Sequence, residues 1–349
     1  MDGAVYIMDV KGRFYLDEFV SQGGASSDTE LISFITGKIT RGLIPMSISE
    51  SEIACSSFTA ETQEGDRLFA RNYDFSKTNT CIVRTQASEG RHASISTVDL
   101  QFLGLDVEKN VEGLANRITC LAVPYIPLDG VNDAGVACGI YMTYQGGDSV
   151  PTDQRTDRPD ITSTTLLRLI LDYADSVEEA VEIASSYDLH DSAKTSYHYM
   201  VADASGRSAI LEWVGKTNDT DTDGTKRELV VTYSDEDSHI GVAEAASDVQ
   251  WITNFIIQPD YYGSDGEKAG YDRYQRIGEE LSRTEGVVAD EQEAMDILAV
   301  VGRRTWNNDD NNSCTVHSAV YNLTDKSVLW VPNEHYGEKG AVYRFEVDR

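Results

Sequence analysis

Two adjacent segments, CSSFTAET (residues 55–62) and RLFARNYDF (67–75), decide how this sequence folds. Both are rich in β-branched and aromatic residues, and the polar stretch QEGD (63–66) between them is typical of a turn. The pair therefore predicts a β-hairpin. Because the second strand of a hairpin returns beside the first, Arg71 and Asp74 are expected close to Cys55 at the start of the first strand.

Cys55 stands where the exposed polar stretch SISESE (47–52) meets this strand. A cut between Ala54 and Cys55 would create an α-amine with a pKa of about 7.7–8.0 beside a thiol of about 8.5. Such an amine is a workable base near neutral pH, Arg71 would favour the thiolate, and Asp74 could orient the amine. By spacing alone, the alternative of a buried cysteine beside a surface Arg–Asp pair stays open.

The rest of the chain mixes strand and helix patterns without βαβ alternation. Strands are predicted at 81–85, 118–125, 135–144, 228–234, 249–255, 314–323, 327–332 and 341–347, with a hairpin over 198–213, and residues 4–10 form a short apolar run. Helices are predicted from Asp28 (as N-cap) to about residue 39, and at 163–175, 176–187, 272–283 and 290–301. Hairpins followed by consecutive helices favour an α+β fold with antiparallel sheets.

Composition narrows the class of protein. The 349 residues carry a formal net charge of -30, which argues against binding bare nucleic acid or an anionic membrane. No window is apolar enough for a transmembrane helix. The N-terminus lacks the features of a signal peptide; if one preceded Met1 and was removed, the protein is extracytoplasmic, and otherwise it is cytoplasmic.

Metal-binding and histidine patterns are weak. Five cysteines without a CxxC predict neither a disulfide framework nor a zinc site. The run 219–224 (DTDTDG) begins like an EF-hand loop, but Val230 stands where the chelating Glu belongs, so a solvated turn is expected; 307–312 is likewise read as a loop. His198 and His317 lie in strand patterns and are interpreted as structural.

The motifs together resemble the choloylglycine hydrolase family of N-terminal-nucleophile (Ntn) hydrolases, which includes bile salt hydrolases, penicillin V acylases and relatives such as N-acylethanolamine acid amidase. The resemblance rests on CSS at 55–57, FARNYD at 69–74, DGVNDAG at 129–135 and the hairpin from His198 to Glu212. It covers most of 55–349. It implies a four-layer αββα sandwich with two antiparallel sheets.

The resemblance also implies a catalytic set. Cys55 is the expected nucleophile, freed by autocatalytic loss of residues 1–54, and Asn254 and Tyr141 are expected to support the oxyanion. The expected site residues are Cys55, Arg71, Asp74, Tyr141, Asn254 and Arg273. No metal or cofactor is implied. The leader (1–54) is expected to pack on the catalytic chain (55–349) through Leu31, Phe34 and Ile35, and so to remain as a bound partner.

Two departures from the bile salt and penicillin V branches bear on function. Only 18 residues separate Asn254 from Arg273, where those branches have a long insertion used in tetramer contacts, and the leader is longer than theirs. Homo-oligomerisation is therefore left open. Both features resemble the N-acyl amidase branch, so the expected substrates are small-molecule N-acyl amides with a long apolar acyl group, such as N-acylethanolamines or N-acyl amino acids. Alternatives are bile salts or penicillin V, an acyltransferase, or a catalytically dead lipid-binding scaffold.

Overall fold

The structure of the chain is a computed structural model. It describes residues 2–12, 14–40, 54–109, 111–143, 154, 156–215, 227–235, 249–259, 261–262, 266–306 and 313–348. The predicted linker 47–52, the EF-hand-like run 219–224 and the loop 307–312 lie outside the described residues.

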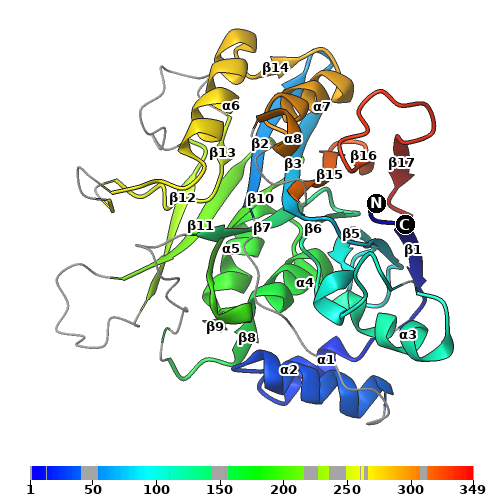
Figure 1. Ribbon diagram of the computed structural model, residues 1–349. Coiled ribbons are helices and arrows are strands. Elements are labelled where there is room, and N and C mark those ends of the chain that lie inside the picture. Colours follow the sequence, from blue (N-terminus) through cyan, green and yellow to red (C-terminus); the bar gives the residue numbers. More distant parts are fainter. Residues whose placement is uncertain are drawn as a thin grey trace.

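Two large sheets form the centre of the molecule (Figure 1). The eight-stranded sheet has the order β1 (Val5–Val10), β4 (Thr80–Thr85), β5 (Ser94–Asp99), β6 (Asp129–Asn132), β7 (Ala137–Thr143), β10 (Ser196–Ala202), β11 (Ser208–Val214), β12 (Glu228–Tyr233). The seven-stranded sheet has the order β13 (Trp251–Ile252), β2 (Ala54–Thr62), β3 (Arg67–Ser76), β15 (Ser313–Asn322), β16 (Ser327–Pro332), β17 (Tyr343–Glu346), with β14 (Val287–Val288) also paired to β2. A small third sheet joins β8 (Asp160–Thr162) to β9 (Asp188–His190).

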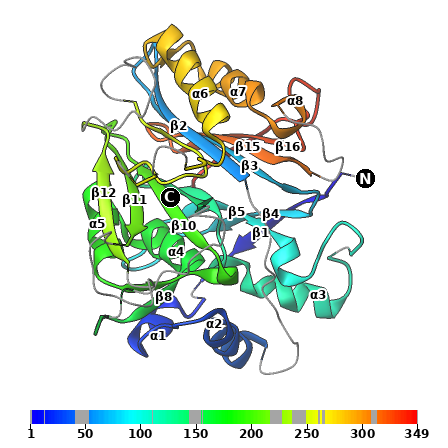
Figure 2. The same cartoon turned by 60° about the vertical axis from the view of Figure 1, so that its left-hand side comes forward.

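Helices cover the outer faces of both sheets, which gives the predicted four layers. The seven-stranded sheet is covered by α6 (Tyr271–Thr284), α7 (Glu291–Val300) and α8 (Arg303–Trp306), and the eight-stranded sheet by α4 (Ser163–Tyr173) and α5 (Val177–Ser185). Figure 2 shows the order from α6 and α7 through the two sheets to α4 and α5. The sheets meet where β2 packs on β7, so this contact positions the start of β2 between the layers. The predicted α+β sandwich is confirmed.

The leader is part of both the sheet and the packing. β1 adds to the edge of the eight-stranded sheet by parallel pairing with β4. The helices α1 (Leu16–Ser21) and α2 (Asp28–Ile35), followed by the π-helix η1 (Thr36–Thr40), lie beyond α4 (Figure 1). Leu31, Phe34 and Ile35 are buried, as expected from their helical spacing. The N-cap of α2 is Ser27, whose side chain accepts the Glu30 N–H, and not Asp28.

The strand predicted at 118–125 is wrong. These residues form the end of α3 (Leu114–Thr119) and the 3₁₀ helix η3 (Cys120–Tyr125). Pro124 has no N–H to give to a sheet ladder, and Tyr125 packs edge-on against Phe14 and Phe19 of the leader. Tertiary burial therefore overrides the strand propensity of the run. Several elements were not anticipated from the sequence. They are the strand β5, the 3₁₀ helices η2 (Leu100–Leu103) and η4 (Ser192–Lys194), and the parallel pairings of β1 and β14. Within the described residues, no helix is both long and apolar enough to span a bilayer.

Candidate active site

Cys55 lies near the start of β2 and is completely buried between the sheets. In the hairpin register it stands opposite Tyr73, and Ser57 stands opposite Arg71. Arg71 Nη2 approaches Cys55 Sγ at 3.5 Å. Burial raises the pKa of the Cys55 thiol to about 12, although Arg71 and the backbone N–H of Asp74 oppose that rise. Arg71 thus lowers the pKa of the Cys55 thiol, as predicted, but in the uncut chain the effect of burial on this pKa is larger.

Arg71 is held in place by a buried carboxylate. Its Nε lies 2.8 Å from Asp129 Oδ2, and its Nη2 donates to the carbonyl oxygen of Ile140 at 2.6 Å. Burial alone would raise the pKa of Asp129, but His317, Arg71 and the Tyr321 hydroxyl together lower it to about 2. Asp129 is therefore ionised and neutralises the arginine at physiological pH.

Asn254 and Arg273 bind the backbone of Cys55 rather than its sulfur. The Cys55 N–H donates to Asn254 Oδ1 at 3.0 Å, and Arg273 Nη2 donates to the same oxygen at 2.7 Å. Arg273 Nη1 donates to the carbonyl oxygen of Cys55 at 2.9 Å. The Asn254 amide nitrogen donates to the carbonyl oxygen of Met142 at 2.8 Å. Two donors on one oxygen fix the orientation of the Asn254 amide.

Asp74 lies beside this group without a hydrogen bond to Cys55 N among the described contacts. Its carboxylate accepts from Thr315 Oγ1 at 2.6 Å and lies 3.3 Å from Arg273 Nη1. Burial raises the pKa of Asp74, and Arg273 and Thr315 only partly offset this. The structure therefore connects the carboxylate of Asp74 to the backbone of Cys55 through Arg273. Its direct contact with an α-amine stays a prediction.

Tyr141 belongs to β7 and packs beneath Arg71. The guanidinium carbon lies 4.3 Å from the centre of the Tyr141 ring, and the hydroxyl donates to Ser57 Oγ. Gly139 makes this possible, because a Cβ there would lie 2.5 Å from Arg71 Nη1 and 2.7 Å from the Tyr141 hydroxyl. Burial raises the pKa of Tyr141 well above its usual range, so the phenol is neutral. Its expected part in an oxyanion site stays a prediction.

Several residues at this site were not predicted as site residues. Asp129 is the first residue of the DGVNDAG turn, so its motif was visible although its contact with Arg71 was not. His317 binds Asp129 at 2.9 Å and stacks on Tyr73. His198, also interpreted as structural, binds Glu212 and the carbonyl of Thr253 beside Asn254. Two more residues were not predicted: Ser57 belongs to the CSS motif at 55–57 but had no assigned role, and Thr315 carries no sequence signal beyond its strand position.

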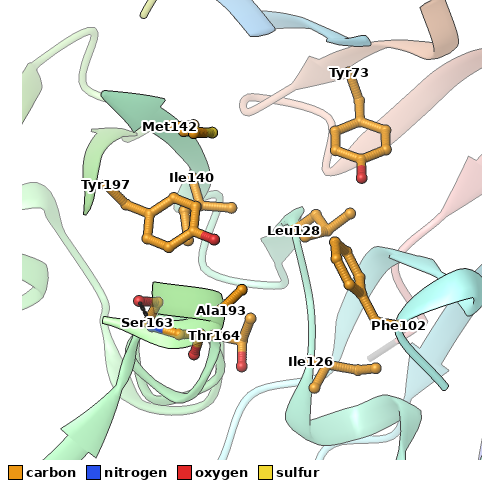
Figure 3. Close-up of a pocket in the computed structure, with 11 residues that line it drawn as sticks. Tyr73, Phe102, Ile126, Leu128, Ile140, Met142, Ser163, Thr164, Ala193 and Tyr197 are labelled. Carbon is orange, nitrogen blue, oxygen red and sulfur yellow. Dashed lines mark hydrogen bonds between the residues drawn. The ribbon is translucent and has the colours of Figure 1, made fainter. Parts of the chain in front are cut away.

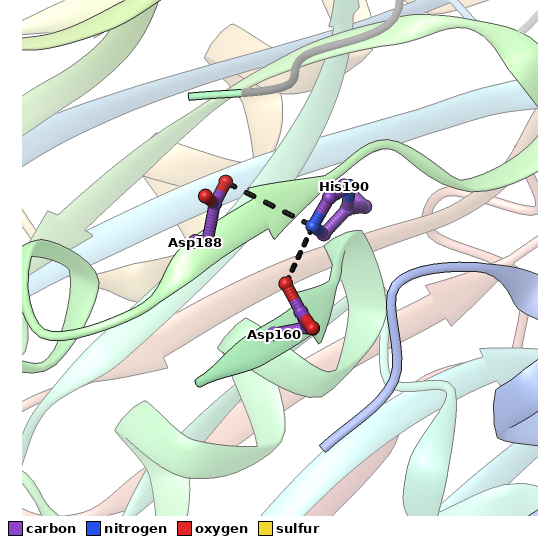
Figure 4. Close-up of side chains that lie close together, drawn as sticks. All are labelled: Asp160, Asp188 and His190. Atoms are coloured by element: carbon purple, nitrogen blue, oxygen red, sulfur yellow. Dashed lines mark hydrogen bonds and ion pairs between the residues drawn. The ribbon is translucent and has the colours of Figure 1, made fainter. Parts of the chain in front are cut away.

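A separate group of possible metal ligands lies on the small sheet (Figure 4). His190 Nε2 contacts Asp160 Oδ1 at 2.8 Å and lies 3.8 Å from Asp188. The Asp188 carboxylate accepts the backbone N–H groups of Gln154 and Thr156 at 3.1 and 2.6 Å. Hydrogen bonds within the protein account for this arrangement, and we assign no ion to it.

Figure 3 shows a cavity whose lining residues include neighbours of the Cys55 site in the sheets. It encloses about 490 Å³ when solvent at its mouth is included. Tyr73, the cross-strand neighbour of Cys55, lines one part of it, and Ile140 and Met142 flank Tyr141. The remaining lining residues are Phe102, Ile126, Leu128, Ser163, Thr164, Ser192, Ala193 and Tyr197. The cavity lining is therefore mostly apolar.

Comparison with known proteins identifies a family match and solved structures of similar fold. Residues 55–218 match the family model of linear amide C–N hydrolases, choloylglycine hydrolase family. No curated protein sequence matches the chain. A mutant conjugated bile acid hydrolase of Clostridium perfringens has a TM-score of 0.55 at 14% identity, over 84% of this chain and 92% of that chain.

Two further solved structures are similar at lower scores. Penicillin V acylase of Agrobacterium tumefaciens has a TM-score of 0.49 at 16% identity, over 84% of this chain and 86% of that one. The N-acylethanolamine-hydrolyzing acid amidase ortholog of Caenorhabditis elegans has a TM-score of 0.45 at 14% identity, over 83% of this chain and 100% of that one. The resemblance predicted from the sequence is confirmed, because residues 55–218 match the model of the choloylglycine hydrolase family of linear amide C–N hydrolases.

Proposed function

We propose that this protein is a self-processing cysteine hydrolase that cleaves N-acyl amides with a long, slim, apolar acyl group. The favoured substrates are N-acylethanolamines or N-acyl amino acids. One observation carries the proposal: the sulfur, the nitrogen and the carbonyl oxygen of Cys55 each have a separate buried polar partner, in Arg71, Asn254 and Arg273. The thiol of a merely structural cysteine needs no buried guanidinium beside it.

The first step is self-cleavage before Cys55. The Cys55 sulfur attacks the carbonyl carbon of Ala54, and the peptide nitrogen leaves with a proton to become the α-amine of Cys55. Water then hydrolyses the Ala54 thioester and releases the carboxylate of Ala54. Asn254 Oδ1 already accepts from the nitrogen that becomes the amine, which supports the step because the amine would keep a hydrogen-bond acceptor.

Amide hydrolysis then uses the same atoms. The thiol of Cys55 passes its proton to the α-amine and attacks the substrate carbonyl, the amine gives the proton to the leaving nitrogen, and water hydrolyses the acyl-thioester. Arg71 stabilises the thiolate, and Asp129 keeps Arg71 in place. An oxyanion site at Asn254 and Tyr141 belongs to this proposal.

We also propose that the leader stays bound after the cut. β1 pairs along its whole length with β4, and the Tyr125 hydroxyl donates to the carbonyl oxygen of Phe14. Arg91 and Arg168 lie over the Phe14 ring at 5.1 and 5.6 Å. Gel filtration of cut protein should therefore give one peak that contains both chains, and separate elution of the leader would contradict this.

The cavity supports the choice of acyl group. Its lining is apolar and aromatic near Tyr73 and Met142, which suits an apolar acyl group. Each buried methylene contributes about 0.8 kcal/mol, or about fourfold in kcat/KM, until the cavity is full.

The testing experiment is a panel of N-acylethanolamines and N-acyl amino acids of increasing acyl length, with conjugated bile salts and penicillin V alongside. We expect kcat/KM to rise with acyl length and to exceed the value for the bile salts. If kcat/KM does not change with acyl length, or if bile salts are hydrolysed fastest, the substrates are those of the bile salt branch instead. Absence of all hydrolysis by cut protein would contradict the hydrolase proposal itself.

A further inference from the structure

Serine and threonine hydroxyls gather at one end of the mostly apolar cavity, which Tyr73 and Tyr197 also line. Ser163 and Thr164 come from the first turn of α4, and Ser192 comes from η4. Figure 3 shows Ser163 and Thr164 across the cavity from Tyr73 and Met142. Since Tyr73 stands opposite Cys55 in the hairpin, the hydroxyl end is the end remote from the expected nucleophile.

Two of these hydroxyls lack a protein partner among the described residues. Ser192 is 5% exposed, and neither its Oγ nor Thr164 Oγ1 makes a hydrogen bond. Ser163 differs, because its Oγ accepts the Ser192 N–H at 2.9 Å and donates to Asp191. A buried hydroxyl without a partner is costly, so a ligand atom that pairs with it gains affinity.

The start of α4 makes this end favourable for an oxygen acceptor. The first N–H groups of a helix have no partner within the helix, and the helix dipole is positive there. The 11 residues of α4 follow the N-cap Thr162, and Thr165 Oγ1 accepts the Thr162 N–H at 2.9 Å. No lining residue is basic, so the expected acceptor is a neutral oxygen rather than a carboxylate.

The leader fixes the turn that carries Ser192. Asp28 Oδ2, at the start of α2, accepts the N–H of Ala193 at 2.8 Å. Ala193 has φ 54°, a left-handed conformation that is unfavourable for a residue with a Cβ. The hydrogen bond from the leader therefore helps hold a strained turn at the end of the cavity. The hydroxyl end of the cavity is therefore held in place by residues of both the leader and the catalytic chain.

From this geometry we infer that the remote end of the cavity, at Thr164 and Ser192, is a polar subsite for a neutral oxygen atom on the acyl chain. The preferred acyl group then carries a hydroxyl or carbonyl oxygen several carbons from the amide. This inference rests on the proposed amide hydrolase function and narrows its substrate class.

The test compares matched medium-chain fatty acids, with and without a single hydroxyl placed at successive carbons, by calorimetric binding to cut wild-type protein. One hydroxyl position should bind more tightly than the parent acid. Thr164→Val and Ser192→Ala should each reduce the ratio of hydroxy-acid affinity to parent-acid affinity by about twofold to tenfold, the range of one neutral hydrogen bond. Ser96→Ala is the matched control, because Ser96 Oγ is also buried without a partner but lies outside the cavity lining.

Two results would overturn the inference. One is that no hydroxy acid binds more tightly than its parent at any position. The other is that the preference survives in the Thr164→Val/Ser192→Ala double variant while the Ser96→Ala control behaves like wild type. Binding is measured without turnover, so a protein that binds hydroxy acids but hydrolyses no amide would contradict the proposed function and not the subsite.

Discussion

Replacing Asp129 with asparagine tests the buried charge arrangement under the candidate nucleophile. Asp129 is completely buried, and its carboxylate contacts Arg71 Nε at 2.8 Å, His317 Nε2 at 2.9 Å and the Tyr321 hydroxyl. The Asp129→Asn substitution would keep the size of the side chain but remove its charge. The guanidinium of Arg71 would then remain buried without a neutralising carboxylate.

The magnitude follows from two independent arguments. Breaking a buried ion pair by removing one partner costs about 3–5 kcal/mol. The pKa of Asp129 falls from 3.8 to about 2 on folding, which corresponds to about 2 kcal/mol of stability. Because the folded pKa is the lower one, this stability is fully present above about pH 4 and is lost as the pH falls toward 2.

The assay is denaturant unfolding at pH 7 of wild type, Asp129→Asn and a control, Asp9→Asn. The control removes the charge of an exposed ion pair with Arg84, which should contribute less than about 1 kcal/mol. We expect the free energy of unfolding of Asp129→Asn at pH 7 to be about 2–5 kcal/mol lower than that of wild type. Acidification to pH 3 should then lower the free energy of unfolding of the variant less than that of wild type. A loss no larger than that of Asp9→Asn would refute the assignment of Asp129 as the counter-charge of Arg71.

Three further predictions concern the thiol, the leader and the charge. In cut protein, Arg71→Lys should shift the pH profile of Cys55 alkylation upward by weakening thiolate stabilisation, and an unchanged profile would remove Arg71 from that role. Asp28→Ala removes the acceptor of the Ala193 N–H, so calorimetry should show a lower affinity for hydroxy acids but not for parent acids. An equal loss of affinity for both would indicate general unfolding of the leader contact. Raising NaCl from about 0.1 to 1 M should raise Tm, because screening weakens the self-repulsion of a chain with net charge -30, and a Tm that falls would contradict this.

Much of the fold was predictable because its strands and turns carry local signals. The hairpin of β2 and β3 and the helices α4 to α7 follow from period, turn residues and caps. Sequence could not predict that 118–125 is helical, because its packing against Phe14 and Phe19 joins segments about a hundred residues apart. The parallel addition of β1 to β4 depends on tertiary contacts in the same way.

The site was predictable only in part for the same reason. Motif spacing placed Arg71 near Cys55, and the family resemblance pointed to Asn254 and Arg273, which the structure brings to Cys55 from distant elements. The ion pair between Asp129 and Arg71 forms only because the two sheets face each other. No sequence signal shows that Asp74 meets Arg273 instead of the Cys55 nitrogen, because that depends on side-chain direction.

The central claim is that Cys55, once freed by self-cleavage, is the nucleophile. The most direct measurement is intact-mass and peptide mapping of protein quenched with acid during turnover of an N-acyl amide. The account predicts a catalytic chain that begins at Cys55 and carries one acyl group on that residue, and an uncut, unacylated chain for Cys55→Ala. An acyl group on another residue, or turnover by a chain that is still joined at Ala54–Cys55, would contradict it.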